Sequence, residues 1–394
     1  MKYSLFLVLL LSTANAQVWD GNWHAAFVLN DTMELPVTFT ASGKQVVFHN
    51  GVEKIICDEF NFKGDSVIIK LPAYLSEIHA RLSGSGMDGY FINPTRTSHQ
   101  VIPFYAEHGL SYRFSDKPER TSVNITGRYR VVFDGEGDDS KNAVGVFNQD
   151  GNYLTGNFLT TSGDHRFLEG EVNGDILWLS AFDGSHLFLH TARIKGDSLV
   201  DGHFYSGSHW HDTWSAVRDS NASLLDADSL SRLNEDVIID FSLPNENGNM
   251  VSLSDDLFKD KAVIIQLMGS WCPNCLDESE FLSEWYSRKP EGIELIALDF
   301  ERVEDTILAM QGIARLKSRL GINYPVVYAG STDRKKALRQ FPFLSRLFAF
   351  PTTIFLDKNK QAVKIHAGFT GRADREEFEK FRRWFESLTT RLAE

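Results

Sequence analysis

The sequence predicts two domains of different class, an all-β domain over residues 17–218 and an α/β domain over residues 237–394. At 394 residues the chain is too long for one ordinary domain. In the first part, short apolar or alternating runs are interrupted by Gly, Asp and Asn every roughly 8–12 residues, which is typical of antiparallel sheets. In the second part, strand-like runs alternate with helical ones, which indicates a central sheet with helices on both faces.

The first 16 residues have the pattern of a secretory signal. Lys2 precedes an apolar stretch from Leu5 to Leu11, and Ala14-Asn-Ala16 is a cleavage site of small residues. The stretch is shorter than the roughly 18 apolar residues that cross a bilayer, and no other segment reaches that length. We therefore expect an exported chain, periplasmic or secreted, with no transmembrane segment after cleavage.

The all-β part carries an internal repeat. Corresponding glycines of three short motifs are separated by 106, 110 and 113 residues, which indicates one duplicated unit with small loop insertions. We expect the two halves to close into a barrel or to pack as a sandwich, with the barrel favoured, because both remove exposed sheet edges. The motif pairs are Gly21-Asn-Trp23 with Gly127-Arg-Tyr129, Lys63-Gly-Asp65 with Asn173-Gly-Asp175, and Met87-Asp-Gly-Tyr-Phe91 with Val200-Asp-Gly-His-Phe204.

Charge is distributed unevenly between the two parts. Residues 236–394 carry 22 basic and 24 acidic side chains, so nearly all of the net charge of −13 lies in the first part. An acidic β-domain disfavours nucleic acid and anionic membrane surfaces as partners. Residues 219–236 are polar and small, and we interpret them as a linker that contains a short helix at most.

The elements of the second domain follow from apolar runs and helical spacing. The last helix places a stripe of Phe and Leu on one face, which suits it to cover a sheet. We expect strands at 237–239, 241–243, 250–253, 262–268, 293–298, 325–328, 352–356 and 362–366, and helices from 276, over 305–320, near 333–340 and at the C-terminus.

The most informative residues are Trp271-Cys272-Pro273-Asn274-Cys275, which lie between a buried strand and a helix. The first cysteine of such a motif lies at a helix N-terminus, where free N–H groups and the helix dipole favour a thiolate. Thiol–disulfide exchange requires this thiolate. Two cysteines three residues apart cannot join distant segments, so this pair is expected to be catalytic or redox-sensing.

The third cysteine, Cys57, lies in a predicted strand and is expected to be a small buried side chain. Three cysteines cannot form a zinc site of two C-x-x-C pairs. His203, His209 and His211 are close in sequence, but no carboxylate pattern completes a site, and we predict no metal.

With these motifs in view, residues from about 237 to 394 resemble the thioredoxin fold, and more closely the TlpA/ResA-type extracytoplasmic disulfide reductases. The resemblance covers about 40% of the chain and does not reach the β-domain. It is carried by Asp240-Phe-Ser-Leu-Pro-Asn-Glu-Asn-Gly248 with Val251-Ser-Leu-Ser254, by Gly269-Ser-Trp-Cys-Pro-Asn-Cys275 and by Phe350-Pro-Thr-Thr-Ile-Phe-Leu-Asp357.

The resemblance implies that Pro351 is a cis-proline facing Cys272. Phe350 would then present its backbone to an extended substrate strand, and Thr352 is assigned to the same substrate-binding segment. Trp271 is expected to be a packing platform beside the site, with a secondary role in recognition.

Two positions bear on proton transfer. Thioredoxins have a buried Asp six residues before the first cysteine, where this chain has Gln266. In the ResA-like branch a Glu three residues after the second cysteine assists proton transfer, and this chain has Glu278 there. The alternative is an ordinary solvated helix residue, since Asp277 and Glu280 flank it.

We therefore predict a thiol–disulfide oxidoreductase that reduces protein disulfides, with no cofactor beyond its own cysteine pair. Cys272 would be the exposed nucleophile and Cys275 the resolving thiol, with an upstream thiol as electron donor. Pro273 and Asn274 add no positive charge beside the thiolate, which favours a moderate reductant over a strong oxidant. Two alternatives stay open: a thiol peroxidase, and a redox sensor whose β-domain binds a ligand or partner.

Overall fold

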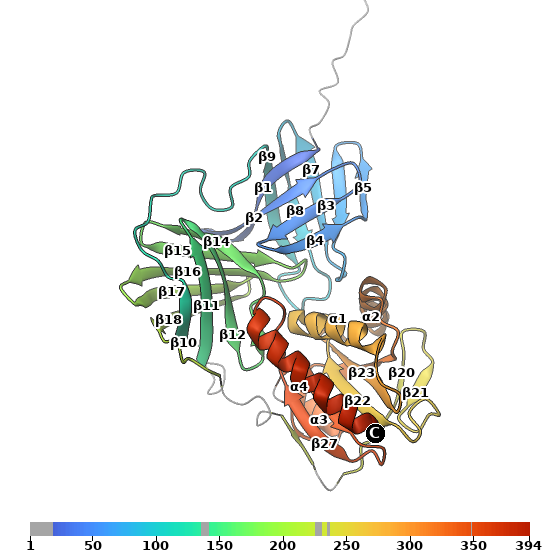
Figure 1. The fold of residues 1–394 in the computed structure, drawn as a ribbon. Coiled ribbons are helices and arrows are strands. Elements are labelled where there is room, and N and C mark those ends of the chain that lie inside the picture. Colours follow the sequence, from blue (N-terminus) through green and yellow to red (C-terminus); the bar gives the residue numbers. More distant parts are fainter. Residues whose placement is uncertain (1–18, 135–141, 225–230, 235–236, 348) are drawn as a thin grey trace, which may run out of the picture.

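The computed structural model describes residues 19–134, 142–224, 231–234, 237–347 and 349–394. The predicted signal segment, 1–16, lies outside the described residues, as do 225–230 and 235–236 of the predicted linker. Figure 1 shows three parts: a first β-sheet, a second β-sheet, and a C-terminal sheet covered by helices. The all-β and α/β classes predicted for the two parts of the chain are both confirmed.

The first half of the β-domain is one antiparallel sheet in the order β4-β3-β2-β1-β9-β8-β7-β6-β5. Alternate side chains of its strands point into a single core, as the period of a half-buried strand requires. The strands are β1 (Gly21–Asn30), β2 (Met33–Ala41), β3 (Val46–Asn50), β4 (Glu53–Cys57), β5 (Phe60–Lys63), β6 (Ser66–Lys70), β7 (Glu77–Ser83), β8 (Gly86–Ile92) and β9 (Val101–His108).

The second half repeats this arrangement with its own core. Its order is β11-β10-β18-β17-β16-β15-β14-β12-β13, and β11 also pairs with β12, so that the sheet closes on itself. The strands are β10 (Gly127–Phe133), β11 (Asn142–Asp150), β12 (Tyr153–Thr160), β13 (Gly163–Asp164), β14 (Leu168–Asn173), β15 (Ile176–Phe182), β16 (Leu187–Lys195), β17 (Ser198–Ser206) and β18 (Trp210–Arg218).

The duplication is thus visible as two nine-stranded sheets whose strand orders correspond, except that only the second has the closing pair of β12 with β14. The predicted duplicated all-β domain with a barrel-like architecture is confirmed, and the structure adds that the two halves form separate sheets. Each half curls into its own barrel-like sheet, because each has enough alternating apolar residues to fill a core of its own. The two sheets then pack through β15 and β16, whose Phe182, Leu187 and Leu189 join the core of the first half.

The repeated Asp-Gly motif has a packing reason. A Cβ atom on Gly89 would lie 2.0 Å from the carbonyl oxygen of His79, and one on Gly202 would lie 2.4 Å from that of Trp214. Both glycines occupy the same place in their repeats and allow two strand backbones to approach closely.

The C-terminal domain has a mixed sheet in the order β24-β23-β22-β26-β27. Strands β22 (Ala262–Met268), β23 (Ile293–Glu301) and β24 (Val326–Ser331) are parallel, whereas β26 (Thr352–Leu356) and β27 (Ala362–Ala367) are antiparallel to their neighbours. Two small ribbons complete the domain: β19 (Arg232–Leu233) pairs with β25 (Leu344–Arg346), and β20 (Ser242–Pro244) with β21 (Met250–Ser252).

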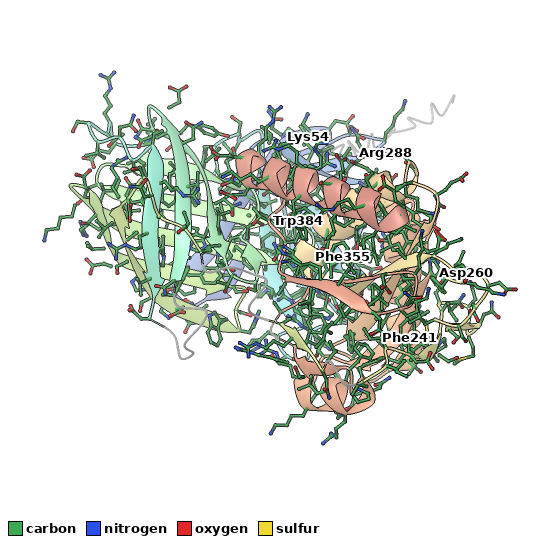
Figure 2. The ribbon with its side chains drawn as sticks, turned by 60° about the horizontal axis from the view of Figure 1, so that its bottom comes forward. Lys54, Phe241, Asp260, Arg288, Phe355 and Trp384 are labelled. Atoms are coloured by element: carbon green, nitrogen blue, oxygen red, sulfur yellow. The ribbon has the colours of Figure 1, made fainter. Side chains whose placement is uncertain are left out.

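Helices cover both faces of this sheet, as predicted. One core contains residues of α1 (Pro273–Tyr286), α2 (Thr306–Leu320) and α4 (Arg375–Ala393), and the other contains residues of α3 (Arg334–Gln340). Figure 2 shows Trp384 of α4 above Phe355 of β26, and their ring centroids are 5.7 Å apart. The predicted strand at 237–239 is wrong: Val237 and Ile239 pack into the second of these cores without sheet pairing.

None of the helices within the described residues is long and apolar enough to cross a membrane.

Because the strand backbones at Gly89 and His79 lie so close, we predict that a side chain at position 89 destabilises the fold. Gly89→Ala should lower the free energy of unfolding by more than about 3 kcal/mol, because the new methyl group collides with backbone that cannot move aside. Gly43→Ala is the matched control, since nothing lies within 4 Å of its added Cβ, and should change stability by less than about 0.5 kcal/mol. Denaturant titration measures both, and equal effects of the two substitutions would contradict the packing account.

Candidate active site

The turn between β22 and α1 places Cys272 at the start of the helix. Cys272 has extended backbone angles, φ −95° and ψ 122°, and is the N-cap of α1, while Pro273 occupies the first helical turn. Gly269 permits this turn, because a Cβ there would lie 2.3 Å from Nε1 of Trp271. The predicted strand–turn–helix setting of the cysteine pair is confirmed.

The two cysteines lie side by side as free thiols. The amide of Cys275 donates a hydrogen bond to Sγ of Cys272 at 3.2 Å, and Sγ of Cys272 lies 3.5 Å from the carbonyl oxygen of Phe350, to which it donates. Burial, together with the neighbouring Cys272, raises the pKa of Cys275 well above its ordinary value. This arrangement separates a thiol held by the helix N-terminus from a thiol kept protonated.

One expectation about this pair is wrong. Cys272 was expected to be exposed, but its exposed fraction is 4%, and Cys275 is fully buried. The physical reason involves the β-domain, which makes hydrogen bonds to Pro273 and Asn274 immediately beside it.

Pro351 has the cis peptide bond that the resemblance implies, and Phe350 precedes it. The carbonyl oxygen of Pro351 accepts a hydrogen bond from the amide of Gly368 at 2.8 Å. Thr352 is different: its side chain is buried and donates to the carbonyl oxygen of Ala349 at 2.8 Å. The structure therefore brings Phe350 and Pro351 to Cys272 but does not direct the Thr352 side chain toward a substrate.

Trp271 is fixed as a platform. Its Nε1 donates to the carbonyl oxygen of Phe300 at 2.8 Å, and its ring is perpendicular to that of Phe350 at 6.0 Å between centroids. The guanidinium of Arg302 lies 3.6 Å from the Trp271 ring centroid, a cation–π contact that the sequence did not indicate. Burial lowers the pKa of Arg302, and the neighbouring Cys272 opposes this effect.

Glu278 is buried beneath the cysteines, with an exposed fraction of 1%. Its two carboxylate oxygens accept hydrogen bonds from Gln266 Nε2 and Thr353 Oγ1, both at 2.8 Å. Loss of hydration on burial raises the pKa of Glu278 to about 7. The alternative of a solvated helix residue is therefore wrong, and Gln266, in the place of the thioredoxin Asp, holds the carboxylate.

A second acidic pair supports the active-site turn from below. The amide of Ser270 donates to Asp299 Oδ1 at 2.8 Å and to Glu301 Oε1 at 3.2 Å. Burial and the adjacent Glu301 raise the pKa of Asp299 well above its ordinary value. Through these two hydrogen bonds the acidic pair fixes the turn that precedes Trp271.

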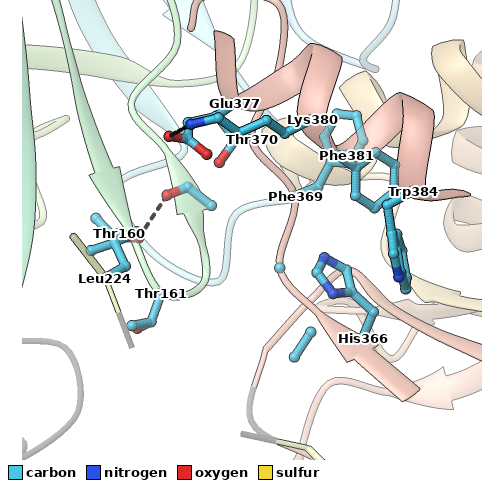
Figure 3. Close-up of a pocket in the computed structure, with 13 residues that line it drawn as sticks. Thr160, Thr161, Leu224, His366, Phe369, Thr370, Glu377, Lys380, Phe381 and Trp384 are labelled. Carbon is cyan, nitrogen blue, oxygen red and sulfur yellow. Dashed lines mark hydrogen bonds and ion pairs between the residues drawn. The ribbon is translucent and has the colours of Figure 1, made fainter. Parts of the chain in front are cut away.

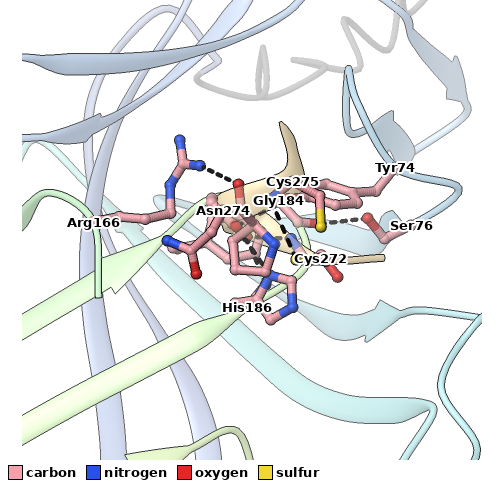
Figure 4. A network of polar contacts seen from close by, with 12 residues as sticks. Tyr74, Ser76, Arg166, Gly184, His186, Cys272, Asn274 and Cys275 are labelled. Carbon is pink, nitrogen blue, oxygen red and sulfur yellow. Dashed lines mark hydrogen bonds and ion pairs between the residues drawn. The ribbon is translucent and has the colours of Figure 1, made fainter. Parts of the chain in front are cut away.

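Residues of the β-domain reach the active-site turn directly. Figure 4 shows Arg166, from the loop between β13 and β14, beside Asn274, with Tyr74, Ser76 and His186 drawn around the cysteine pair. Arg166 has no signal in the sequence, since it is one charged residue in a loop, and these contacts were not predicted.

Cys57 lies in β4 and is buried, as expected. Burial raises the pKa of its thiol to about 12. Of the three histidines, His203 and His211 are 3.0 Å apart at Nδ1 and Nε2. Among the described residues no group of three His, Cys, Asp or Glu side chains is arranged to hold a metal ion.

A cavity of about 350 Å³ lies between the β12–β13 hairpin and helix α4. Figure 3 shows its aromatic wall, formed by His366, Phe381 and Trp384, opposite Thr160 and Thr161. The cysteines do not line it.

Comparison with known proteins identifies the C-terminal domain only. The Redoxin family model matches residues 234–381. The thiol-disulfide oxidoreductase ResA of Bacillus subtilis is 30% identical over 129 residues, which are 32% of this chain and 64% of that protein. ResA of Halalkalibacterium halodurans is 27% identical over 141 residues, 36% of this chain and 71% of that protein.

Solved structures align with the same region. A DsbF homologue from Corynebacterium diphtheriae has 20% identity and a TM-score of 0.30, covering 39% of this chain and 93% of that one. A thiol-disulfide oxidoreductase from Bacteroides fragilis has 19% identity and a TM-score of 0.26, covering 36% of this chain and 96% of that one.

Burial of Glu278 predicts a pH-dependent stability effect. Its pKa in the folded chain, about 7, exceeds its ordinary value of 4.5, so its contribution to stability is full below about pH 4.5 and is lost as the pH rises through 7. Glu278→Gln removes this loss. It should raise the free energy of unfolding by up to about 3 kcal/mol at about pH 8 and by little at about pH 4.

Urea titrations at the two pH values measure the effect. Glu280→Gln, an exposed position on the same helix, is the control and should change stability by less than about 0.5 kcal/mol at either pH. A Glu278→Gln effect that does not grow with pH would show that this carboxylate is not buried as described.

Proposed function

We propose that this protein, whose C-terminal domain is a ResA-like Redoxin domain, is an extracytoplasmic thiol–disulfide oxidoreductase that reduces protein disulfides through Cys272 and Cys275. The observation that carries the proposal is the placement of Cys272 Sγ. This sulfur accepts a hydrogen bond from the Cys275 amide at the N-terminus of α1. It also lies 3.5 Å from the carbonyl oxygen of Phe350, the residue before the cis-proline.

The first step is attack by the Cys272 thiolate on one sulfur of the substrate disulfide. A Cys272–substrate disulfide forms, the substrate S–S bond breaks, and the second substrate sulfur leaves as a thiolate. The helix N-terminus supports this step, because its free N–H groups stabilise negative charge on Sγ.

The second step resolves the mixed disulfide. Cys275 loses its proton and attacks Cys272 Sγ, so that the Cys272–Cys275 bond forms and the first substrate sulfur leaves as a thiolate. The substrate gains two electrons and the cysteine pair loses two. An upstream thiol donor returns the pair to the reduced state, and no further cofactor takes part.

Glu278 is suited to accept the Cys275 proton. The two residues are one helical turn apart, both are buried, and the charge of Glu278 contributes to the raised pKa of Cys275. A carboxyl group with a pKa of about 7 changes protonation near neutral pH, where a proton acceptor for a thiol is useful.

Export is proposed from the sequence pattern of residues 1–16. The proposed partners are protein disulfides and a thiol electron donor, and no nucleic acid is expected because of the acidic β-domain.

Trapping the mixed disulfide tests the mechanism. Cys275→Ser should accumulate a covalent complex with a disulfide-containing protein substrate, because the resolving thiol is missing. Cys272→Ser should form no such complex and should lose all turnover. Glu278→Gln should keep the first step and slow the second by about 10- to 100-fold above pH 7. The readouts are non-reducing gels, mass spectrometry and single-turnover kinetics of substrate thiol release.

Two outcomes would contradict the proposal. Turnover that persists in Cys272→Ser would place the chemistry elsewhere. Fast consumption of peroxide, with protein disulfides untouched, would identify a thiol peroxidase instead.

A further inference from the structure

Two buried residues of the β-domain, one at the end of β13 and one in the loop after it, bind the first turn of helix α1. Asp164 accepts hydrogen bonds from Asn274 Nδ2 at its backbone oxygen and at Oδ1, both at 3.1 Å. Arg166 donates from Nη1 to the carbonyl oxygen of Pro273 at 3.1 Å and to Asp277 Oδ1 at 2.7 Å. We call Asp164 and Arg166 the clamp, because they hold the two residues between the cysteines.

The clamp is built into three parts of the molecule. Nη2 of Arg166 also binds Glu53 of the first sheet at 2.5 Å, and Oδ2 of Asp164 accepts from the Gly371 amide at 3.0 Å. The side chain of Arg166 is 5% exposed and carries an ion pair on either side. A buried charge with two partners fixes a geometry strongly, because separation leaves each partner uncompensated.

The backbone at the clamp is shaped for close contact. Arg166 has φ 60°, a left-handed conformation that non-glycine residues rarely adopt. Gly163 has φ 148°, and a Cβ there would lie 2.3 Å from Cγ of Asn274. The loop can approach the active-site turn this closely only with glycine at 163.

A second attachment lies on helix α2. Arg315 donates from Nε and Nη2 to the carbonyl oxygen of Leu71, at 3.1 and 2.8 Å, and from Nη1 to Glu59 at 3.2 Å. The β-domain is therefore held on the helix α1–α2 side of the C-terminal sheet at two separate points.

Access to the nucleophile follows from this docking. Cys272 is adjacent to the clamped Pro273, and its exposed fraction is 4%. Disulfide exchange requires the attacking sulfur to come within bonding distance of the substrate sulfur. A disulfide in a folded protein carries bulky surroundings that cannot enter a site this closed, whereas a small disulfide needs much less room.

We propose that Asp164 and Arg166 are specificity-determining residues: while the clamp is closed Cys272 reacts with small disulfides, and disulfides in folded proteins gain access when it opens. The inference rests on the proposed function for its substrates, but the accessibility it asserts can be measured without any turnover.

The test compares alkylation of Cys272 by a small reagent, iodoacetamide, with alkylation by a bulky polyethylene-glycol maleimide. Full-length Asp164→Ala/Arg166→Met should react with the bulky reagent at least 10-fold faster than wild type, with a smaller change for iodoacetamide. Arg193→Gln is the matched control, because it removes an exposed ion pair with Asp175 inside the same sheet, and should react like wild type. Peptide mapping by mass spectrometry assigns the label to Cys272.

Gly163→Ala gives a second, independent variant, since its new methyl group would push Asn274 away without removing a charge. It too should speed bulky labelling. Circular dichroism and a cooperative thermal transition establish that each variant is folded. Wild-type labelling by the bulky reagent as fast as that of both opened variants would overturn the proposal.

An activity measurement separates this proposal from the proposed function. The ratio of insulin reduction to reduction of a small aromatic disulfide should rise at least fivefold in the two opened variants, and an unchanged ratio would contradict the clamp's role in specificity. If no variant and no wild type reduces either disulfide, the proposed function fails, and the labelling rates still decide whether the clamp closes the site.

Discussion

The amide of Cys275 donates a hydrogen bond to Sγ of Cys272, and this contact fixes the first turn of helix α1. The strand before it is buried along its whole length, Gly269 makes the turn, and Pro273 begins the helix. Because the helix N-terminus stabilises negative charge, the same contact that caps the helix prepares a nucleophile. The remaining features of the molecule act on this turn.

Below the turn, buried carboxyl groups lie near the cysteines and hold the turn by hydrogen bonds. Glu278 is held by Gln266 and Thr353, and the Asp299–Glu301 pair binds the Ser270 amide. Carboxyl groups without water favour their neutral form, and burial raises the pKa values of both Glu278 and Asp299. Above the turn, the β-domain contributes a buried arginine and a buried aspartate that bind the residues between the cysteines. The dithiol is therefore enclosed by structure from both domains.

Much of this could be predicted from the sequence, because local pattern determines local structure. Strands β22 and β26 have the predicted bounds, and helices α2 and α3 begin after the Asp residues that cap them. Periodicity indicates burial but not hydrogen-bond partners. This is why residues 237–239 were assigned to a strand although they pack without pairing. The repeat was recognised from glycine spacing, but whether two halves share a core or form two depends on how the sheets curl.

In the candidate site, too, residues in motifs could be predicted and contacts between distant residues could not. The cysteines, cis-Pro351 and Glu278 lie in or near motifs, and the structure brings them together. The burial of Cys272 could not be predicted, because the adjacent Pro273 is bound by Arg166, which is 107 residues away in the sequence. Contacts between distant residues of this kind have no periodicity and no motif. Thr352 was assigned to the substrate-binding segment because it follows the cis-proline in the sequence. Its side chain instead donates a hydrogen bond to the carbonyl oxygen of Ala349.

The claim that Cys272 and Cys275 form a reducing dithiol is tested most directly by a redox titration of this couple in the full chain. The readout is the mass that alkylation adds to the reduced form. We expect one reversible two-electron transition at about −250 mV, between glutaredoxins and thioredoxin, since no positive side chain lies between the cysteines. A potential near about −120 mV, that of a strong oxidant, or a pair that forms no intramolecular disulfide, would contradict this claim.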